Sequence, residues 1–192
     1  PIAFRFLAGV RARTDLPITL LVYYNLIHQY GLEPFYKTAA ASGVNAVLVA
    51  DLPIEEAGPA IEAAKAHGIA PVFIVSELTS SDRLERVLAV AEGYLYLVAR
   101  VGITGEQSAV DSGMATTVAR LRARTGLPIL AGFGISSPEQ VREVIEAGVD
   151  GAICGSAIVR RIEQHLGDPE AMIDAVSQFA IEMKAATCPP LE

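Results

Sequence analysis

The chain has 192 residues, of which 52% are hydrophobic and only 19% are charged. We therefore expect one compact domain rather than a disordered chain. A formal net charge of −7 argues against nucleic acid or an anionic membrane surface as the main partner. A small metabolite is the more plausible ligand, and the overall charge still allows a local positive pocket for an anion.

Cys154 and Cys188 have no His or Cys at metal-ligand spacing, so neither a metal site nor a disulfide framework is predicted. No apolar run approaches the roughly 20 residues that a membrane span needs. There is no charged and apolar leader, and the first residue is Pro1 rather than methionine. We therefore expect a cytoplasmic protein, with a plastid as the alternative, and a chain that starts downstream of its gene's start.

Residues 1–14 have the pattern of the end of a helix that leads into a strand. Six short apolar segments follow, rich in β-branched residues and bounded by turn residues, as in strands buried on both faces. These predicted strands are residues 17–23, 45–50, 70–75, 93–99, 127–133 and 150–154.

Amphipathic segments with helix start and stop signals separate these strands, among them residues 53–68, 80–93 and 136–148. The first opens on Pro53 and acidic residues, and the second on Ser80 or Ser81. The third has a serine cap before Pro138, and all three close at a glycine. The alternation of strand and helix predicts a parallel sheet with right-handed crossovers.

The interval between the strands at 93–99 and 127–133 is longer than the others. The excess lies in residues 100–113, which are rich in Gly and Ser and predict a loop long enough to cover a site.

Two pairs of segments in the chain resemble each other. RARTDLPI (11–18) recurs as RARTGLPI (122–129), and GVNAVLVADLP (43–53) aligns loosely with GVDGAICGSAI (148–158). A duplicated half-barrel would leave this echo in a (β/α)₈ barrel, although helix-to-strand corners in general also favour Gly, Pro and apolar residues. We expect a TIM-barrel fold in which residues 1–192 form one partial domain of about six βα units, with the first two strands upstream.

Glycines gather at the predicted carboxyl ends of the late strands, which share one face in a barrel. Their backbone N–H groups could converge on one anion, and GSAIVRRIE (155–163) begins a helix whose N-terminus favours negative charge. A dinucleotide site fits less well, because GFGISS (132–137) lacks the third glycine of the Rossmann fingerprint. Tight turns without a ligand are the remaining alternative. The residues concerned are Gly102, Gly105, Gly132, Gly134, Gly155 and Ser156.

Five segments spread over the chain resemble the alpha subunit family of tryptophan synthase, barrel enzymes that cleave indole-3-glycerol phosphate into indole and glyceraldehyde 3-phosphate. They are LLVYYNLIHQYG (20–31), VNAVLVADLPIEE (44–56), GYLYLVARVGITGE (93–106), GFGISSPEQV (132–141) and GAICGSAIV (151–159).

The resemblance implies where the substrate binds. The phosphate would contact Gly105, Phe133, Gly134, Gly155 and Ser156. The indole ring would pack against Leu21, Leu48, Tyr96 and Ile153.

The resemblance gives Thr104 and Tyr96 supporting roles, Thr104 as the loop residue that closes over the site. The family's catalytic Glu and Asp would fall upstream of Pro1, so we do not expect residues 1–192 to be active by themselves. Asp51 ends a strand and is the best remaining acid, although its place before a helix also offers a structural reason for it. No metal or cofactor is expected in this chain.

The resemblance also implies a partner, a tryptophan synthase beta subunit that carries pyridoxal phosphate in an alpha2-beta2 assembly and meets residues 23–31 and 51–56. Two other functions stay open. One is a non-catalytic remnant that binds phosphate or the partner. The other is a sugar-phosphate isomerase or epimerase, which would need its own acid–base pair on the strands.

Overall fold

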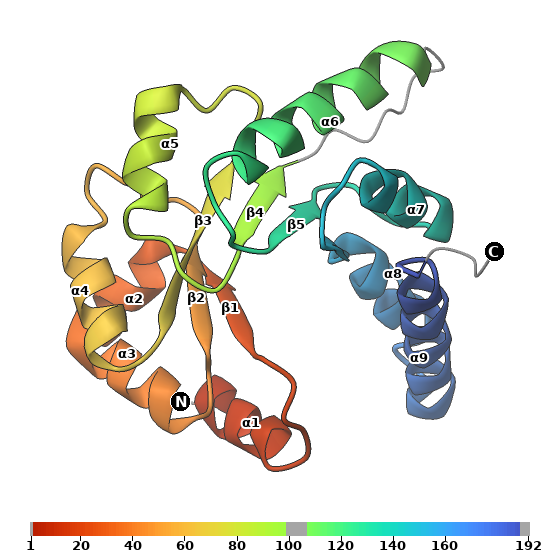
Figure 1. Ribbon diagram of the computed structural model, residues 1–192. Helices are drawn as coiled ribbons and strands as arrows, with labels where there is room; N and C mark the ends of the chain where they lie inside the picture. The colour runs from red at the N-terminus through yellow and green to blue at the C-terminus, as the bar shows by residue number, and fades with distance from the viewer. Residues whose placement is uncertain (1, 99–106, 189–192) are drawn as a thin grey trace. The chain divides into compact units, whose positions relative to one another are not determined.

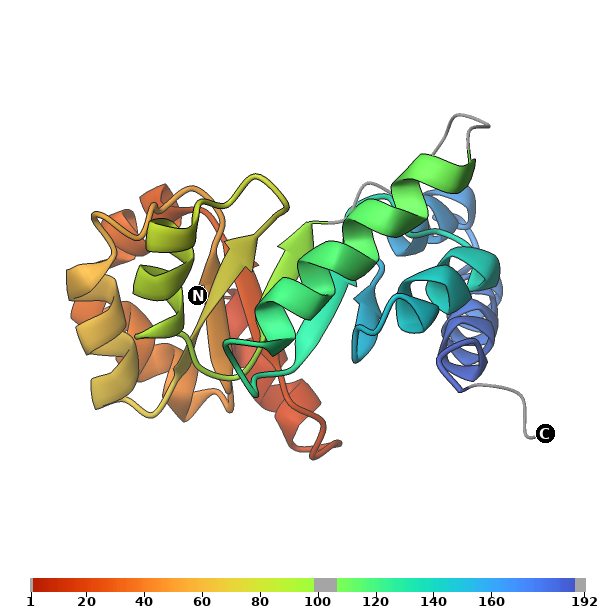
Figure 2. The same ribbon diagram turned by 45° about the horizontal axis from the view of Figure 1, so that its top comes forward.

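A computed structural model describes residues 2–98 and 107–188, with side chains described outside 99–112. It divides into two compact units, residues Pro1–Leu95 and Tyr96–Glu192, here called unit 1 and unit 2 (Figure 1). Each unit combines parallel strands with flanking helices, which the turned view in Figure 2 also shows. The expectation of one domain over residues 1–192 stays a prediction.

Unit 1 contains three parallel strands in chain order, with Leu21 of β1 opposite Leu48 of β2, and Leu48 opposite Val72 of β3. Side chains alternate between the two faces of a strand, so these three residues share one face. The elements are α1 (Ile2–Arg11), β1 (Thr19–Val22), α2 (Tyr24–Tyr30), α3 (Leu32–Ala41), β2 (Ala46–Val49), α4 (Gly58–Ala66), β3 (Ala70–Val75) and α5 (Ser81–Leu88).

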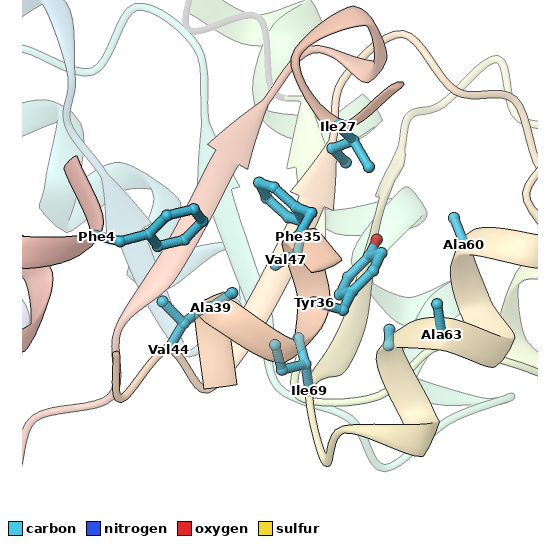
Figure 3. Packing of buried hydrophobic residues seen from close by; sticks show 11 residues of the cluster. Phe4, Ile27, Phe35, Tyr36, Ala39, Val44, Val47, Ala60, Ala63 and Ile69 are labelled. Carbon is cyan, nitrogen blue, oxygen red and sulfur yellow. The ribbon is translucent and has the colours of Figure 1, made fainter. Parts of the chain in front are cut away.

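The core of unit 1 lies between its strands and helices α1, α3 and α4 (Figure 3). Phe35 and Tyr36 of α3 pack with Val47 of β2, and Phe4 meets Phe35 edge-on with ring centroids 5.6 Å apart. Burial, with a smaller contribution from Tyr24, raises the pKa of Tyr36 to about 12, so its hydroxyl stays neutral at physiological pH.

Unit 2 pairs β5 with β6 in parallel, with Gly132 opposite Ile153. Ile129 and Ala131 are fully buried, and so are Val141 and Val144 of the following helix. The elements are β4 (Leu95–Val98, which begins at the last residue of unit 1), α6 (Gln107–Arg122), β5 (Ile129–Gly132), α7 (Pro138–Glu146), β6 (Gly151–Ile153), α8 (Ser156–Gln164) and α9 (Pro169–Ala185).

All six predicted strands are confirmed, each one to three residues shorter at its ends or of the same length. The predicted helix start at Pro53 is wrong, because α4 begins at Gly58. Pro59 explains the difference: proline is tolerated in the first turn of a helix but would break its interior. The predicted loop 100–113 is partly wrong, since α6 starts at Gln107.

Helix caps were the most accurate local signals. Ser80 caps α5 by accepting the N–H of Arg83, although the helix ends at Leu88 rather than at residue 93. Ser137 caps α7 in a capping box with Gln140, as serine followed three residues later by glutamine favours.

Arg11 forms a hydrogen-bonded clip in unit 1 between two helix-to-strand corners. Its Nη2 donates to the carbonyls of Leu16 (2.9 Å) and Gly43 (3.0 Å) and to Asn45 Oδ1 (2.8 Å). The same Oδ1 accepts the N–H of Ile18 at 2.9 Å. Asn45 therefore joins the start of β1 to the corner before β2.

Arg122 forms the same clip in unit 2. It donates to the carbonyls of Leu127 (3.1 Å) and Gly148 (3.4 Å) and to the carboxylate of Asp150. Asp150 Oδ2 also accepts the N–H of Ile129 at 2.7 Å. The similarity between residues 11–18 and 122–129 therefore extends from the sequence to the hydrogen bonds.

The two clips differ in one chemical respect, since Asn45 is neutral where Asp150 is charged. Burial raises the pKa of Asp150, but the hydrogen bonds from Arg122 and the Ile129 N–H, together with the charge of Arg122, lower it below its ordinary value. A lowered carboxyl pKa stabilises the folded state above the unfolded pKa of about 3.9, and this contribution disappears as pH falls through the folded value.

We expect Asp150→Asn to lower the free energy of unfolding by about 1 kcal/mol at pH 7, a value limited by the partial exposure of the pair. As pH falls through the lowered pKa of Asp150 the loss should shrink towards zero, because the wild-type carboxyl then becomes protonated. Urea titrations at pH 7 and at successively lower pH values measure this. Asn45→Asp is the matched control and should introduce acid sensitivity into unit 1. An equal loss at every pH would contradict the explanation.

Candidate functional site

The carboxyl ends of β5 and β6 form the candidate substrate site of unit 2. The pairing of Gly132 with Ile153 brings the next residues of both strands, Phe133 and Gly134 on one and Gly155 on the other, to the same edge. This is the edge at which parallel α/β sheets bind their ligands. The structure therefore brings together four of the five predicted phosphate residues, Phe133, Gly134, Gly155 and Ser156.

The backbone bends immediately after β5. Phe133 has a φ of 94° and Gly134 a φ of 83°, and Phe133 is the only non-glycine with positive φ in the part of the chain that the structure describes. Such a residue costs roughly 1–3 kcal/mol, and strain of this kind is concentrated at ligand sites. Phe133 is also 67% exposed, so packing of its ring does not account for the strain.

Helix α8 begins at Ser156, and only Cys154 and Gly155 separate it from the end of β6. Its N-cap residue is Gly155, and no side chain caps the helix. Ser80, Ser137 and Asp168 supply side-chain caps to α5, α7 and α9, whereas the N-cap residues of α3 and α4, like that of α8, supply none. The N–H of Ile158 bonds the carbonyl of Gly155 at 2.9 Å, which leaves the N–H groups of Ser156 and Ala157 for an external acceptor, and the helix dipole favours an anion there.

Asp51 occupies the position in unit 1 that Ser156 occupies in unit 2 when the two echoing segments are aligned. Asp51 Oδ1 accepts the N–H of Tyr24, the first residue of α2, at 2.7 Å. The carboxylate thus satisfies a helix N-terminus, which supports its structural role over a catalytic one. At the equivalent place Ser156 is shorter and neutral, which leaves room for the charge of a ligand.

Tyr96 and Ile153 flank Gly132 on one face of the strands of unit 2. A Cβ atom built on Gly132 would overlap the ring of Tyr96, and Ile153 is the cross-strand partner of Gly132. Tyr96 and Ile153 are half-buried, whereas Leu95 and Leu97 on the opposite face of β4 are buried. The structure therefore brings two of the four predicted indole contacts, Tyr96 and Ile153, next to Gly132.

The other two predicted indole contacts lie in unit 1. Leu21 and Leu48 are cross-strand partners on the face turned away from Val47, and Leu21 is 57% exposed while Leu48 is 1% exposed. Thr104 and Gly105 lie outside the described residues. Sequence reasoning counted Gly132 as a turn glycine and missed that it makes room for Tyr96, for which the alternation of residues along β4 and β5 gave the only signal.

The loop after β2 is held to helix α5 by ion pairs. Glu55 contacts Arg86 at 3.1 Å and Arg83 at 3.4 Å. A cavity of about 450 Å³ lies between this loop, the end of β3 and α5, and its lining includes Asp51, Thr79 and Arg83. Half-exposed ion pairs thus connect Glu55, within the segment 51–56 that is expected to meet a partner, to α5.

Among residues 2–98 and 107–188, no group of His, Cys, Asp and Glu side chains is arranged to hold a metal ion. In the same part of the chain, no helix combines the length and apolar character that crossing a membrane requires.

Comparisons with known proteins identify the family of this chain. The family model described as tryptophan synthase alpha chain matches residues 2–188. The alpha chain of Methanothermobacter thermautotrophicus is 45% identical over 183 residues, which cover 95% of this chain and 68% of the relative. That of Shewanella oneidensis is 46% identical over 185 residues, which cover 96% of this chain and 66% of the relative.

Solved structures show the same fold. The tryptophan synthase alpha subunit of Legionella pneumophila matches 96% of this chain and 68% of its own with a TM-score of 0.83 and 27% identity. A chain from the tryptophan synthase a2b2 complex of Pyrococcus furiosus matches 95% and 73% with a TM-score of 0.83 and 31% identity. The expected TIM-barrel class is confirmed, and the chain belongs to the tryptophan synthase alpha chain family.

Proposed function

We propose that this chain acts as the alpha chain of tryptophan synthase and takes part in the retro-aldol cleavage of indole-3-glycerol phosphate. The observation that carries the proposal is the uncapped N-terminus of α8 beside the strained turn at Phe133 and Gly134. Together they offer backbone N–H groups to a phosphate, next to the apolar surface of Tyr96 and Ile153.

The two parts of the site have different tasks in this reaction. The N–H groups of α8 fix the phosphate at one end of the substrate, and Ser156 adds a hydroxyl donor there. Tyr96 and Ile153 provide the surface on which the indole ring packs, with Leu21 and Leu48 as the further contacts that the family resemblance implies. Holding both ends orients the bond that breaks, which is a large part of what a binding site contributes to catalysis.

Cleavage breaks the bond between the indole carbon and the glycerol chain. The electron pair of that bond remains on the indole side, where the carbon is protonated, while a hydroxyl of the glycerol chain loses its proton and becomes the aldehyde. A general acid and base must move these protons. By the family resemblance a Glu moves these protons and an Asp stabilises positive charge on the indole nitrogen, both from the first two βα units of the barrel.

We further propose that the chain assembles with a tryptophan synthase beta subunit, that pyridoxal phosphate belongs to that partner, and that the assembly is cytoplasmic. The match to the a2b2 complex of Pyrococcus furiosus supports the assembly. The ion pairs of Glu55 support it too, because they connect the segment 51–56 that would meet the partner to α5.

An activity assay tests the proposal. The chain, expressed with all residues that its gene encodes, should release glyceraldehyde 3-phosphate from indole-3-glycerol phosphate, and a beta subunit should increase the rate. Binding of the substrate without turnover, with or without a beta subunit, would identify a non-catalytic remnant instead. Turnover of a sugar phosphate but not of the indole compound would identify an isomerase or epimerase.

A further inference from the structure

A second cavity in unit 2 is lined mainly by basic and polar side chains. It has a volume of about 420 Å³, which is within the range of small-molecule sites. Helix α8 contributes most of the lining at positions three and four residues apart, so these side chains share one face of the helix. The lining residues are Ser136, Ala157, Arg160, Arg161, Gln164, His165 and Ala175.

The charge of this cavity is opposite to that of the protein. The chain carries a formal net charge of −7, yet the cavity is lined by two arginines and by no Asp or Glu. Within residues 2–98 and 107–188, neither Arg160 nor Arg161 has a carboxylate within ion-pair distance. What sets these two arginines apart from the protein's other cations is that they line one cavity together.

Arg161 is held in place without any acidic partner. Its Nη1 donates to the carbonyl of Ala157 at 2.8 Å, and its guanidinium carbon lies 3.6 Å from the centre of the Phe179 ring on α9. Stacking on an aromatic ring leaves the remaining N–H donors in the plane of the guanidinium, where a phosphate or carboxylate can accept them. The cation is therefore fixed before any ligand arrives.

Neighbouring groups add to this arrangement. His165 Nδ1 bonds the carbonyl of Arg161 at 2.8 Å, which orients the ring and fixes the last turn of α8. Gln164 and Arg160 are exposed and lie on the same face, so both can reach a ligand in the cavity. Ser136 at the other end is hydrogen-bonded to Gln140.

We propose that this cavity binds a small molecule with at least two negative charges, carried by phosphate or carboxylate groups. The charge, the unpaired arginines and the volume together point to this class of ligand. One end of the cavity adjoins the substrate site, because Ala157 follows Ser156 directly. The other end is distinct from it, since Gln164 and His165 follow Ser156 by more than two helical turns, about 12 Å along the axis of α8.

Titration by ¹⁵N NMR on the full chain tests the proposal, with pyrophosphate and citrate as probes at constant ionic strength. We expect saturable shifts of the Gln164, His165 and Ala175 amides, which are distinct from any response of Gly155 and Ser156 to a phosphate in the substrate site. A response to pyrophosphate alone identifies a phosphate ligand, one to citrate alone a polycarboxylate, and one to both the shared chemistry. No saturable shift with either probe would overturn the proposal.

Two variants separate a built site from general attraction. Arg160→Gln should weaken binding at least about fivefold, because it removes a cation from the cavity. Arg142→Gln removes an arginine from α7 that pairs with Glu139, and it should change the affinity by less than about twofold. If both variants weaken binding equally, the anion responds only to net charge and the proposal fails, while the proposed substrate site is untouched by that outcome.

Discussion

Ser156→Asp is expected to raise the KM for indole-3-glycerol phosphate at least about 100-fold while leaving the fold intact. A carboxylate at the first position of α8 would occupy the place where the substrate phosphate binds, and like charges in close contact cost several kcal/mol. The same carboxylate interacts favourably with the helix dipole, so the free energy of unfolding should stay the same or increase. Steady-state kinetics and urea unfolding measure the two effects separately.

Ser156→Asn is the matched control, since asparagine has nearly the size of aspartate but no charge. We expect its KM to rise less than about tenfold. Unit 1 already contains an aspartate that binds a helix N-terminus. Asp51, which aligns with Ser156 in the sequence repeat, accepts the N–H of Tyr24, the first residue of α2. A KM for Ser156→Asp that equals that of Ser156→Asn would place the phosphate elsewhere.

The strands of this fold could be predicted from sequence because each is a short apolar run between turn residues, a signal contained within the run itself. Ser80 and Ser137 likewise cap helices through bonds to residues three positions away. Helix α2 gave no such signal: Tyr23 does not cap it, and Asp51 satisfies its first residue from a distant loop. Contacts between distant residues are not encoded in any local pattern.

The candidate site shows the same limit. The glycines after β5 and β6 pointed to an anion, but the positive φ of Phe133 could not be predicted, because a phenylalanine carries no sequence signal for that conformation. The family resemblance, rather than periodicity, placed Phe133 in the site. The basic cavity beside α8 was missed because it depends on how α9 packs, through Phe179, against Arg161.

The sequence repeat alone is compatible with duplication and with the shared chemistry of helix-to-strand corners. Arg11 and Arg122 favour duplication, because general corner chemistry does not require an arginine to bond two carbonyls and one Asn or Asp oxygen in the same order. The strand register repeats as well, with Leu21 opposite Leu48 in unit 1 and Gly132 opposite Ile153 in unit 2. Gly132 thus occupies the position that corresponds to Leu21 in unit 1.

Gly132→Ala is expected to damage both stability and the apolar pocket, because the added Cβ would overlap the ring of Tyr96. Overpacking of this kind costs about 1–3 kcal/mol, and a displaced Tyr96 should also raise the KM for the indole substrate. Urea unfolding and steady-state kinetics measure both. Gly126→Ala is the matched control in the same unit, since a Cβ there would meet no atom within 4 Å, and it should change neither quantity.

A double-mutant cycle identifies the cause of the damage. Tyr96→Ala should cost stability alone through lost packing, but in its presence Gly132→Ala should cost about 1 kcal/mol or less, because the overlapping ring is gone. If Gly132→Ala destabilises equally with and without the tyrosine ring, the glycine is needed for its backbone and not for the space it leaves. The KM offers a second criterion, because only displacement of Tyr96 links a methyl group on β5 to binding of the indole ring.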